Sequence, residues 1–456
     1  MSKVRIIGAG LAGAECAWQI ARLGVPVELF EMKPVRHSPA HHTDGFAELV
    51  CSNSLRSADT SNAVGLLKEE LRLLGSLIIE AAHASAVPAG SALAVDRARF
   101  SAYITDRITK HPLITVRREE VTSLPDDGVV TVVASGPLTD GALADAIAEI
   151  TGGDSLSFYD AAAPIVDFAS VNMDVAYFAT RYGKGNPDDY LNCPLSREQY
   201  DAFYEALISA KEAPLKEFDA SMQKKDVTVF EGCMPVEIMA RRGYDTLRFG
   251  PMKPVGLPHP ETGEEAYAVV QLRRENTEGT MYNLVGFQTH LTFGEQKRVF
   301  GLIPGLENAE FLRYGVMHRN TYLRSPGLLS ADYSMRKRPT LFFAGQMTGV
   351  EGYVESASSG FVAGINAARR VLGMEPFHFP RETVIGSLAD YVASATTPSF
   401  QPMNANFGLI APLTYKVKGG KKFRNAEYAV RSVKLTEELC RTLFDQNEGD
   451  SSESSD

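Results

Sequence analysis

The sequence predicts an α/β protein with a Rossmann-like nucleotide-binding domain, split along the chain by an inserted, smaller α+β domain. Three observations lead to this prediction. A strand, a glycine-rich turn and a helix open the chain, and a second set of the same three elements begins near residue 340. Between them the regular alternation of strands and helices is lost. A strand that runs through a glycine turn into a helix is the building unit of a doubly wound sheet.

The opening unit consists of the apolar strand Val4–Ile7, a glycine turn and a helix over Ala14–Leu23. In the turn, Gly8 permits the tight bend and Gly10 lets the backbone approach a pyrophosphate. Gly13 lets the helix lie close to the strand. The residues of this turn that we expect to contact a dinucleotide are Gly8, Ala9, Gly10, Leu11, Ala12 and Gly13.

A second strand, Val27–Phe30, ends in Glu31, which follows Gly8 by 23 residues. An acidic side chain at this distance hydrogen-bonds a ribose hydroxyl, while the pyrophosphate lies on the N-terminus of the helix. The pattern therefore predicts dinucleotide binding. The alternative is a glycine-rich turn in an ordinary βαβ unit.

The segment 33–61 is long, rich in turn-forming residues, and contains His37, His41, His42 and Cys51. Loops of this length inside compact domains are usually functional. These side chains lack the C-x-x-C or H-x-x-x-H spacing of a metal site, so no metal is expected. Apolar periodicity and capping residues predict helices over 64–74, 96–110 and 140–151 and strands over 114–117 and 128–134.

The strand Thr340–Ala344 leads into a glycine loop and a helix over 354–372. Small residues in the first half of that helix allow it to approach another element or a flat ring. A domain with two strand–loop–helix ends is typical of flavin proteins, in which one end holds the ADP half and the other faces the isoalloxazine. We therefore predict FAD, with an ordinary sheet-to-helix turn as the alternative. The expected contacts at this end are Gly345, Gln346, Gly349, Val350, Glu351, Gly352 and Tyr353.

These elements divide the chain into four parts. Residues 1–160 form the first part of the FAD-binding domain, and 161–325 form the inserted domain for substrate or RNA. Residues 326–445 form the second part, with a basic C-terminal portion. The acidic, serine-rich tail 446–456 is expected to be disordered.

The composition is that of a soluble globular protein, with 456 residues of which 44% are hydrophobic and 22% charged. A net charge of −10 excludes general attraction to nucleic acid, so an RNA site must be a local basic patch. Residues 398–434 contain seven basic residues and one acid, which makes them a candidate contact for RNA phosphates; the alternative is a solvated surface. The basic residues lie closest together at Lys416, Lys418, Lys421, Lys422 and Arg424.

No apolar run reaches the length of a membrane span.

The five cysteines include no C-x-x-C pair, which suits a reducing cytosol and predicts a cytoplasmic protein. Cys51 lies in the loop that we expect near the flavin. Cys233 lies in a sharp turn before a helix that carries Arg241 and Arg242. A helix N-terminus and nearby arginines favour a thiolate, and thiolates add well to polarised double bonds. Cys51 and Cys233 are therefore the candidate catalytic residues, whereas a buried, inert side chain is the ordinary state of a cysteine.

Two motifs carry a family resemblance, TLRFGPMKPVG at 246–256 and RYGVMHRNT at 313–321. With them the chain resembles the folate- and FAD-dependent tRNA (uracil-5-)-methyltransferase family (TrmFO), which is related to the GidA/MnmG flavoproteins. The resemblance covers about residues 4–372. Phe293 departs from it, because many relatives carry Trp there, so the packing around His290 is less certain. The matching stretches are 6–13, 48–57, 135–138, 158–165, 230–243, 245–257, 285–298, 303–321 and 343–356.

The resemblance implies an activity. NADH or NADPH reduces FAD, and the reduced flavin takes a methylene group from 5,10-methylenetetrahydrofolate. A cysteine thiolate adds to C6 of the T-loop uracil of tRNA (position 54), C5 attacks the methylene group, and hydride from the flavin completes the methyl group. Such a reaction needs a flavin platform, a thiolate and a splayed-out base.

The resemblance also implies roles for single residues. Cys233 is the favoured nucleophile and Cys51 the second thiol, although the two roles can be exchanged. His290 resembles the residue that stacks on the folate pterin; the alternative is a surface histidine. Arg241 and Arg242, like the basic C-terminal portion, are expected to contact tRNA. The expected state is a monomer.

Three other activities remain open from the sequence. The first is a GidA/MnmG-type enzyme for wobble uridine, but such enzymes carry a long helical C-terminal domain that we do not expect here. The second is the same chemistry on ribosomal RNA. The third is a redox or binding flavoprotein that does not alkylate RNA, against which the two cysteines and the basic stretch argue.

Overall fold

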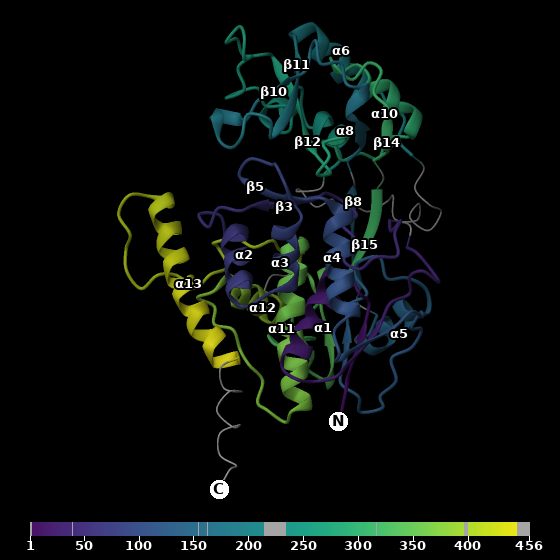
Figure 1. The fold of residues 1–456 in the computed structure, drawn as a ribbon, viewed down its shortest axis with the longest axis vertical. Coiled ribbons are helices and arrows are strands. Elements are labelled where there is room, and N and C mark those ends of the chain that lie inside the picture. Colours follow the sequence, from purple (N-terminus) through teal and green to yellow (C-terminus); the bar gives the residue numbers. More distant parts are fainter. Residues whose placement is uncertain are drawn as a thin grey trace.

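The computed structural model describes residues 2–38, 40–153, 155–161, 163–213, 234–315, 317–395 and 400–444, and only the backbone of 155–161 and 317–319. Figure 1 shows an α/β body and, above it, a smaller lobe built on a second sheet. Among the described helices, none has both the length and the apolar character needed to cross a bilayer.

The body is built on a six-stranded sheet in the order β16-β17-β7-β1-β2-β6. Neighbouring strands from β17 to β6 are parallel, whereas β16 is antiparallel to β17. The strand from the end of the chain, β17, therefore lies in one sheet with the opening strand β1. The predicted split Rossmann-like fold is confirmed. The strands are β1 (Val4–Ile7), β2 (Val27–Phe30), β6 (Ile114–Arg117), β7 (Thr131–Val133), β16 (Ser334–Met335) and β17 (Arg338–Phe343).

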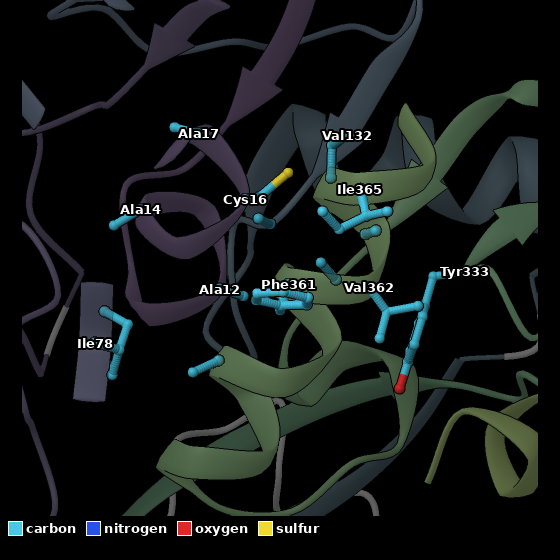
Figure 2. Packing of buried hydrophobic residues seen from close by; sticks show 14 of the residues in the cluster. Ala12, Ala14, Cys16, Ala17, Ile78, Val132, Tyr333, Phe361, Val362 and Ile365 are labelled. Carbon is cyan, nitrogen blue, oxygen red and sulfur yellow. The ribbon is translucent and has the colours of Figure 1, made fainter. Parts of the chain in front are cut away.

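Helices α1 (Leu11–Arg22) and α11 (Tyr353–Val371) pack directly against each other beside this sheet (Figure 2). A Cβ atom added to Gly360 would lie 2.2 Å from the carbonyl oxygen of Ala12, and one added to Gly364 would lie 2.8 Å from that of Cys16. The small residues of α11 thus serve close contact with another helix, which was one of the two predicted uses.

Four further helices and a small sheet complete the first half of the body. Asp96 caps its helix by accepting a hydrogen bond from the backbone N–H of Arg99 at 3.0 Å, as the sequence predicts. Helix α3 and the antiparallel sheet β3-β5-β4 were not predicted. The elements are α2 (Ala63–Leu73), α3 (Leu77–Ala84), α4 (Arg97–Thr109), α5 (Gly141–Thr151), β3 (Ser54–Ser57), β4 (Ala86–Val87) and β5 (Ala92–Val95).

The upper lobe is built on an antiparallel sheet in the order β10-β11-β12-β13-β9-β14. A two-stranded ribbon, β8 (Ser155–Ala161) and β15 (Met317–Leu323), lies where the chain leaves the body and returns to it (Figure 1). The predicted domain limits at 160 and 325 fall in this ribbon and just after it, and they stay a prediction. The strands are β9 (Ile165–Asp167), β10 (Tyr177–Phe178), β11 (Tyr190–Leu195), β12 (Ala268–Arg274), β13 (Met281–Leu284) and β14 (Phe311–Arg313). The helices are α6 (Arg197–Ile208), α8 (Val236–Arg241), α9 (Thr246–Phe249) and α10 (Phe293–Phe300).

After α11 the chain adds two helices, α12 (Val384–Ser394) and α13 (Lys421–Phe444), and α13 lies along the flank of the body (Figure 1). The buried carboxylate of Glu70 on α2 is hydrogen-bonded to both helices. It accepts hydrogen bonds from the backbone N–H groups of Val384 and Ile385 at 2.8 and 2.9 Å, and from the hydroxyl of Ser432 at 2.5 Å. A single side chain thus caps α12 and holds α13.

The stability of the protein is expected to depend on the protonation of Glu70. Burial raises the pKa of Glu70 to about 7, although its hydrogen bonds oppose the rise. The folded state therefore holds this proton more tightly than the unfolded state does, so stability falls as the pH rises from about 4.5 to 7. The contribution of Glu70 to this fall is about 3 kcal/mol. In Glu70→Gln, the decline measured by thermal unfolding between pH 5 and 7 should be shallower than in the wild type, at a cost of about 1–2 kcal/mol for the lost acceptor.

The neighbouring Glu69 is a matched control, because its partner Arg72 lowers the pKa of Glu69. Glu69→Gln should leave the decrease of stability with rising pH unchanged. A Glu70→Gln protein whose stability declines as steeply as that of the wild type over this pH range would show that Glu70 does not contribute to the decline.

Candidate active site

A deep pocket runs from the glycine turn after β1 to the glycine loop after β17. Its empty space is about 1220 Å³, counting its open mouth. The two glycine segments, predicted separately from the sequence, thus border one cavity. The predicted cofactor contacts that line it are Gly8, Ala9, Gly10, Leu11, Ala12, Glu31, Gly345, Gln346 and Tyr353.

The first glycine turn has the geometry of a pyrophosphate site. Gly8 has a φ of +98°, and a Cβ atom there would lie 2.6 Å from the carbonyl oxygen of Ala134. A Cβ atom on Gly13 would lie 1.8 Å from the carbonyl oxygen of Gly8, so Gly13 serves packing and does not line the pocket. At Gly10 no protein atom lies within 4 Å of such a Cβ atom, and no side chain caps α1 there. The turn therefore leaves open space at the helix N-terminus, where an anion is favoured.

Glu31 lies at the end of β2 and faces the same turn. Its carboxylate accepts hydrogen bonds from the backbone N–H groups of Ala9 at 2.9 Å and Lys33 at 3.0 Å. The side chain is buried and lines the pocket. A carboxylate fixed in this way is placed to accept a hydrogen bond from a ribose hydroxyl group of a dinucleotide.

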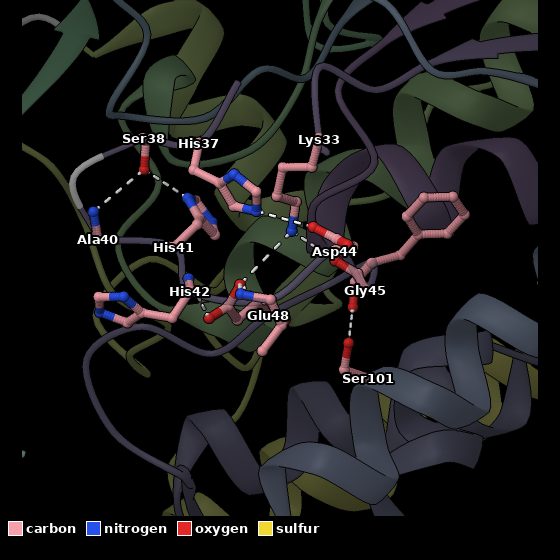
Figure 3. Close-up of polar contacts among 12 residues, drawn as sticks. Lys33, His37, Ser38, Ala40, His41, His42, Asp44, Gly45, Glu48 and Ser101 are labelled. Atoms are coloured by element: carbon pink, nitrogen blue, oxygen red, sulfur yellow. Dashed lines mark hydrogen bonds and ion pairs between the residues drawn. The ribbon is translucent and has the colours of Figure 1, made fainter. Parts of the chain in front are cut away.

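A polar network in the segment after Glu31 forms one wall of the pocket (Figure 3). The buried ammonium of Lys33 donates to the carbonyl oxygen of Gly45 at 2.5 Å and lies 3.6 Å from the carboxylate of Glu48. The ring of His41 is hydrogen-bonded to the hydroxyl of Ser38 at 2.6 Å. Burial, and next the charge of Lys33, lower the pKa of His41, so the ring is neutral near pH 7. In the described ranges, no three His, Cys, Asp or Glu side chains come together to hold a metal ion.

The second glycine segment lines the pocket only in part. Gly345 has a φ of +87° and begins the short helix η4 (Gln346–Thr348). Gly349, Val350, Glu351 and Gly352 do not line the pocket and shape the loop instead. Glu351 accepts a hydrogen bond from the side chain of Gln346 at 2.5 Å. A Cβ atom added to Gly349 would lie 2.4 Å from the ring of Phe400.

Cys51 does not line the pocket itself, but hydrogen bonds join its turn to Tyr353 at this second end. Its backbone N–H donates to the hydroxyl oxygen of Tyr353 at 2.8 Å, and the N–H of Ser52 donates to the same oxygen at 3.2 Å. Tyr353 and the preceding residue Val50 both line the pocket. The role of Cys51 beside a flavin stays a prediction.

Two arginines hold the carbonyl groups before Cys51. Arg97, at the start of α4, donates to the carbonyl oxygen of Leu49 at 2.6 Å and forms an ion pair with Glu275 at 2.9 Å. Arg313, at the end of β14, donates to the carbonyl oxygen of Val50. Burial, and next the charge of Arg97, lower the pKa of Arg313. Two cations from different parts of the chain thus converge on the cysteine turn.

A third arginine ties the residues after Cys51 to the upper lobe. Arg273, on β12, donates to the hydroxyl of Ser52 at 3.0 Å and to the side-chain oxygen of Asn53 at 2.9 Å. The side-chain nitrogen of Asn53 donates in return to the carbonyl oxygen of Arg274 at 3.0 Å. The turn 49–53 is therefore held from both lobes. The partners Arg97, Arg273 and Arg313 were not predicted; the run RYGVMHRNT contained Arg313, but nothing in it pointed to Cys51.

The predicted nucleophile Cys233 lies outside the described residues. The residues that follow it adjoin His290, because the N–H of Val236 donates to the carbonyl oxygen of Gln288 at 2.7 Å. The N–H of His290 donates to the carboxylate of Glu237, also at 2.7 Å. Burial lowers the pKa of His290 and favours a neutral ring. Cys233 is thus close in the chain to a segment that contacts the predicted folate residue.

The predicted RNA contacts lie in two places. Arg241 forms an ion pair with Glu212 at 2.5 Å, and Arg242 is exposed at the end of α8. On the flank, the basic residues before and at the start of α13 are all exposed. Within the described part of the chain they form no ion pair with an acidic side chain. They are Lys416, Lys418, Lys421, Lys422 and Arg424.

Comparison with known proteins identifies the family. Residues 3–375 match the family model described as glucose inhibited division protein A (GIDA). A methylenetetrahydrofolate–tRNA-(uracil-5-)-methyltransferase TrmFO of Listeria innocua is 58% identical over 96% of this chain and 99% of its own length. The protein of the same name from Heliobacterium modesticaldum is 61% identical over 95% and 97% of the two chains.

A solved structure agrees with this relationship. GidA of Aquifex aeolicus superimposes with a TM-score of 0.68 at 18% identity and covers 98% of this chain and 76% of its own. At this identity the likeness shows the fold alone. The full-length matches at close to 60% identity confirm the resemblance seen in the motifs: the chain belongs to the GidA family of flavoproteins and, within it, to the TrmFO group.

Proposed function

We propose that this protein is a methylenetetrahydrofolate- and FAD-dependent tRNA (uracil-5-)-methyltransferase that uses NADH or NADPH as reductant and acts on the T-loop uridine at position 54. The observation that carries the proposal is the placement of Cys51. Its turn is hydrogen-bonded to Tyr353, at the end of the pocket opposite the pyrophosphate turn. A thiol near the second end of a dinucleotide cavity suits group transfer to a pyrimidine, which needs a nucleophile or a proton acceptor there.

The residues of the pocket fit FAD. The open space at Gly10 and the uncapped start of α1 suit the pyrophosphate, and Glu31 suits the ribose. When bound and reduced, FAD supplies the carrier for the one-carbon unit and the hydride that makes it a methyl group. Gln346 and Tyr353 would lie beside the isoalloxazine at the opposite end.

The chain's own side chains provide the remaining chemistry. In this proposal the thiolate of Cys233 adds to C6 of uracil, and Cys51 serves as the second thiol that accepts the C5 proton; the two roles can be exchanged. The neutral ring of His290 stacks on the pterin of the folate. Arg97 and Arg313 hold the carbonyl groups of the cysteine turn and place two positive charges beside it.

A direct assay tests the proposal. Purified protein is incubated with NADPH, methylenetetrahydrofolate labelled in its methylene group, and tRNA that lacks the modification. Label at C5 of uridine 54 is the expected result. Label only in a wobble uridine, label only in ribosomal RNA, or no label would each contradict it and favour one of the three other activities.

We also propose that the basic residues around the start of α13 bind tRNA phosphates. Reversing Lys416, Lys421 and Lys422 to Glu should weaken tRNA binding by about 10–100-fold at moderate salt and make it less dependent on salt, because fewer counterions are released. Filter binding at several salt concentrations measures both effects. The same change of net charge at Lys3, Lys110 and Lys337 is the control and should alter binding far less. Equal losses in the two triple variants would mean that only net charge matters.

We propose a cytoplasmic monomer divided at about residues 160 and 325. Size-exclusion chromatography with light scattering should give the mass of one chain. Limited proteolysis should cut first near these two limits, since exposed connections between domains are the preferred sites of cleavage.

A further inference from the structure

The segment 246–256 contains the short helix α9 and the loop after it, and none of its residues lines the cofactor pocket. The proposed function therefore leaves this segment without a role. Phe249, the last residue of α9, is 82% exposed, more than any other large apolar side chain in the described part of the chain. A single exposed apolar side chain is ordinary, so the surroundings of Phe249 decide its meaning.

The residues on either side of Phe249 hold its backbone in place and leave its ring uncovered. Leu247 and Met252 are fully buried, and the N–H of Met252 donates to the carbonyl oxygen of Leu247 at 2.8 Å, which closes a tight turn around Phe249. Arg248 donates to the carbonyl oxygen of Tyr267 at 3.0 Å, and its guanidinium lies 3.7 Å from the centre of the Tyr267 ring. The backbone of Phe249 is thus ordered before any partner binds, which lowers the entropic cost of binding.

The loop after this turn is held against the segment that leads to His290. Arg181 donates to the carbonyl oxygen of Lys253 at 2.9 Å. A Cβ atom added to Gly286 would lie 2.6 Å from the Cβ atom of Pro251, so the proline packs on the backbone there. Gly286 precedes His290, the predicted folate residue, by four positions. The turn that presents Phe249 therefore adjoins a segment of the proposed active site.

Basic side chains lie on both sides of Phe249 along the chain. Residues 241–256 contain four basic side chains and one acidic side chain, and the chain turns acidic only at 261–265. Arg242 is exposed at the end of α8, which packs against α9, and Lys253 is partly exposed. A flat apolar ring among cations fits RNA, because unpaired bases stack on aromatic rings and phosphates attract cations.

We propose that Phe249 stacks on an unpaired base in the loop of the substrate RNA, while Arg242 and Lys253 bind the phosphates beside that base. This surface on the upper lobe is separate from the basic residues around the start of α13, which lie on the flank of the body (Figure 1). The choice of RNA rests on the proposed function. A loop from which the target base is splayed out needs such support, because its neighbouring bases lose a stacking partner.

Binding of a stem-loop RNA that carries the T-loop tests the proposal. Phe249→Ala should raise the Kd about tenfold and leave its salt dependence unchanged, because a stacking ring is lost but no charge. Phe249→Tyr keeps a flat ring and should bind like the wild type, whereas Phe249→Leu should bind as weakly as Phe249→Ala. Lys253→Ala should instead lower the salt slope by about one.

Two controls separate stacking from general effects. A fully paired RNA duplex of the same length should bind the wild type and Phe249→Ala equally, since its bases are not free to stack on a side chain. Leu372→Ala removes another apolar side chain, 50% exposed at the end of α11, and should leave stem-loop binding unchanged. In the methyl-transfer assay, Phe249→Ala should raise KM for tRNA about tenfold with kcat unchanged, because the lost contact is made equally in the ground and transition states.

Wild-type affinity of Phe249→Ala for the stem-loop, or an equal loss on stem-loop and duplex, overturns the proposal. A dimer that Phe249→Ala dissociates without weaker RNA binding would also overturn it and would show that a second copy covers the ring. RNA binding needs no methyl transfer, so the two failures are distinct. A wild type that binds the stem-loop through Phe249 but does not methylate it contradicts only the proposed function.

Discussion

Replacing Gly10 by valine should give a folded protein that no longer holds FAD. The backbone at Gly10 has φ −70° and ψ −170°, which valine adopts without strain, and no protein atom lies within 4 Å of a Cβ atom there. The new side chain would instead project into the space that suits the pyrophosphate. We expect FAD affinity to fall by at least about 100-fold, a loss of roughly 3 kcal/mol, with little change in thermal stability. The visible absorption of the purified protein and its unfolding temperature measure the two effects.

Gly294→Val is the matched control, because this glycine in α10 also has open space around its Cβ position and no positive φ. It should remain yellow. Gly8→Val would be a poor substitute for Gly10→Val, since Gly8 has a positive φ and lies close to Ala134, so the fold itself would suffer. If Gly10→Val binds FAD with wild-type affinity, the pyrophosphate does not lie at this turn.

Replacing Cys51 by alanine should lower methyl transfer by at least about 1000-fold while FAD remains bound, because removal of a reacting thiol eliminates the chemical step and not the cofactor contacts. The turn itself should persist, since Tyr353, Arg97 and Arg313 hold its backbone and not its sulfur. Single-turnover transfer of the labelled methylene group to tRNA measures the loss. Cys233→Ala should have an effect of similar size.

Cys440→Ser on α13 serves as the control for removal of a thiol and should keep full activity. Cys16 is unsuitable, because it is fully buried against α11 and burial raises its pKa, as expected for a packing residue. A Cys51→Ala protein with wild-type turnover would refute the assignment of Cys51 to the reaction.

The sequence predicted the body of the protein well because its elements are defined by local patterns. The strands Val4–Ile7, Val27–Phe30 and Ile114–Arg117 have the predicted limits. Each is a short apolar run bounded by turn residues, and such runs pair in parallel when helices intervene. The glycines at 8 and 13 were predicted for the same reason, because the positive φ of Gly8 belongs to a local turn and Gly13 packs against Gly8; the approach of Gly8 to Ala134 was not predictable in this way.

The surroundings of Cys51 were not predictable in this way. Tyr353 lies about 300 residues along the chain from Cys51, from whose N–H group it accepts a hydrogen bond. Arg273 and Arg313 come from strands of the sheet in the upper lobe. No spacing rule connects residues so far apart. Helix α13 was missed for another reason: it carries many charged side chains, and only a minority of its residues, among them Tyr428, Ala429 and Leu443, are buried in the apolar core.

The packing of α1 against α11 has a consequence for how the protein is made in the cell. The two helices are separated by more than 300 residues, and the strand that precedes α11 must join the first sheet beside β7. On a ribosome that adds about 5–20 residues per second, the N-terminal glycine turn waits roughly 20–70 s for its partner to emerge. The strands of the upper lobe, β9 to β14, are all synthesised within that interval and can pair before α11 emerges, so cofactor capture is expected to be among the last events of biosynthesis.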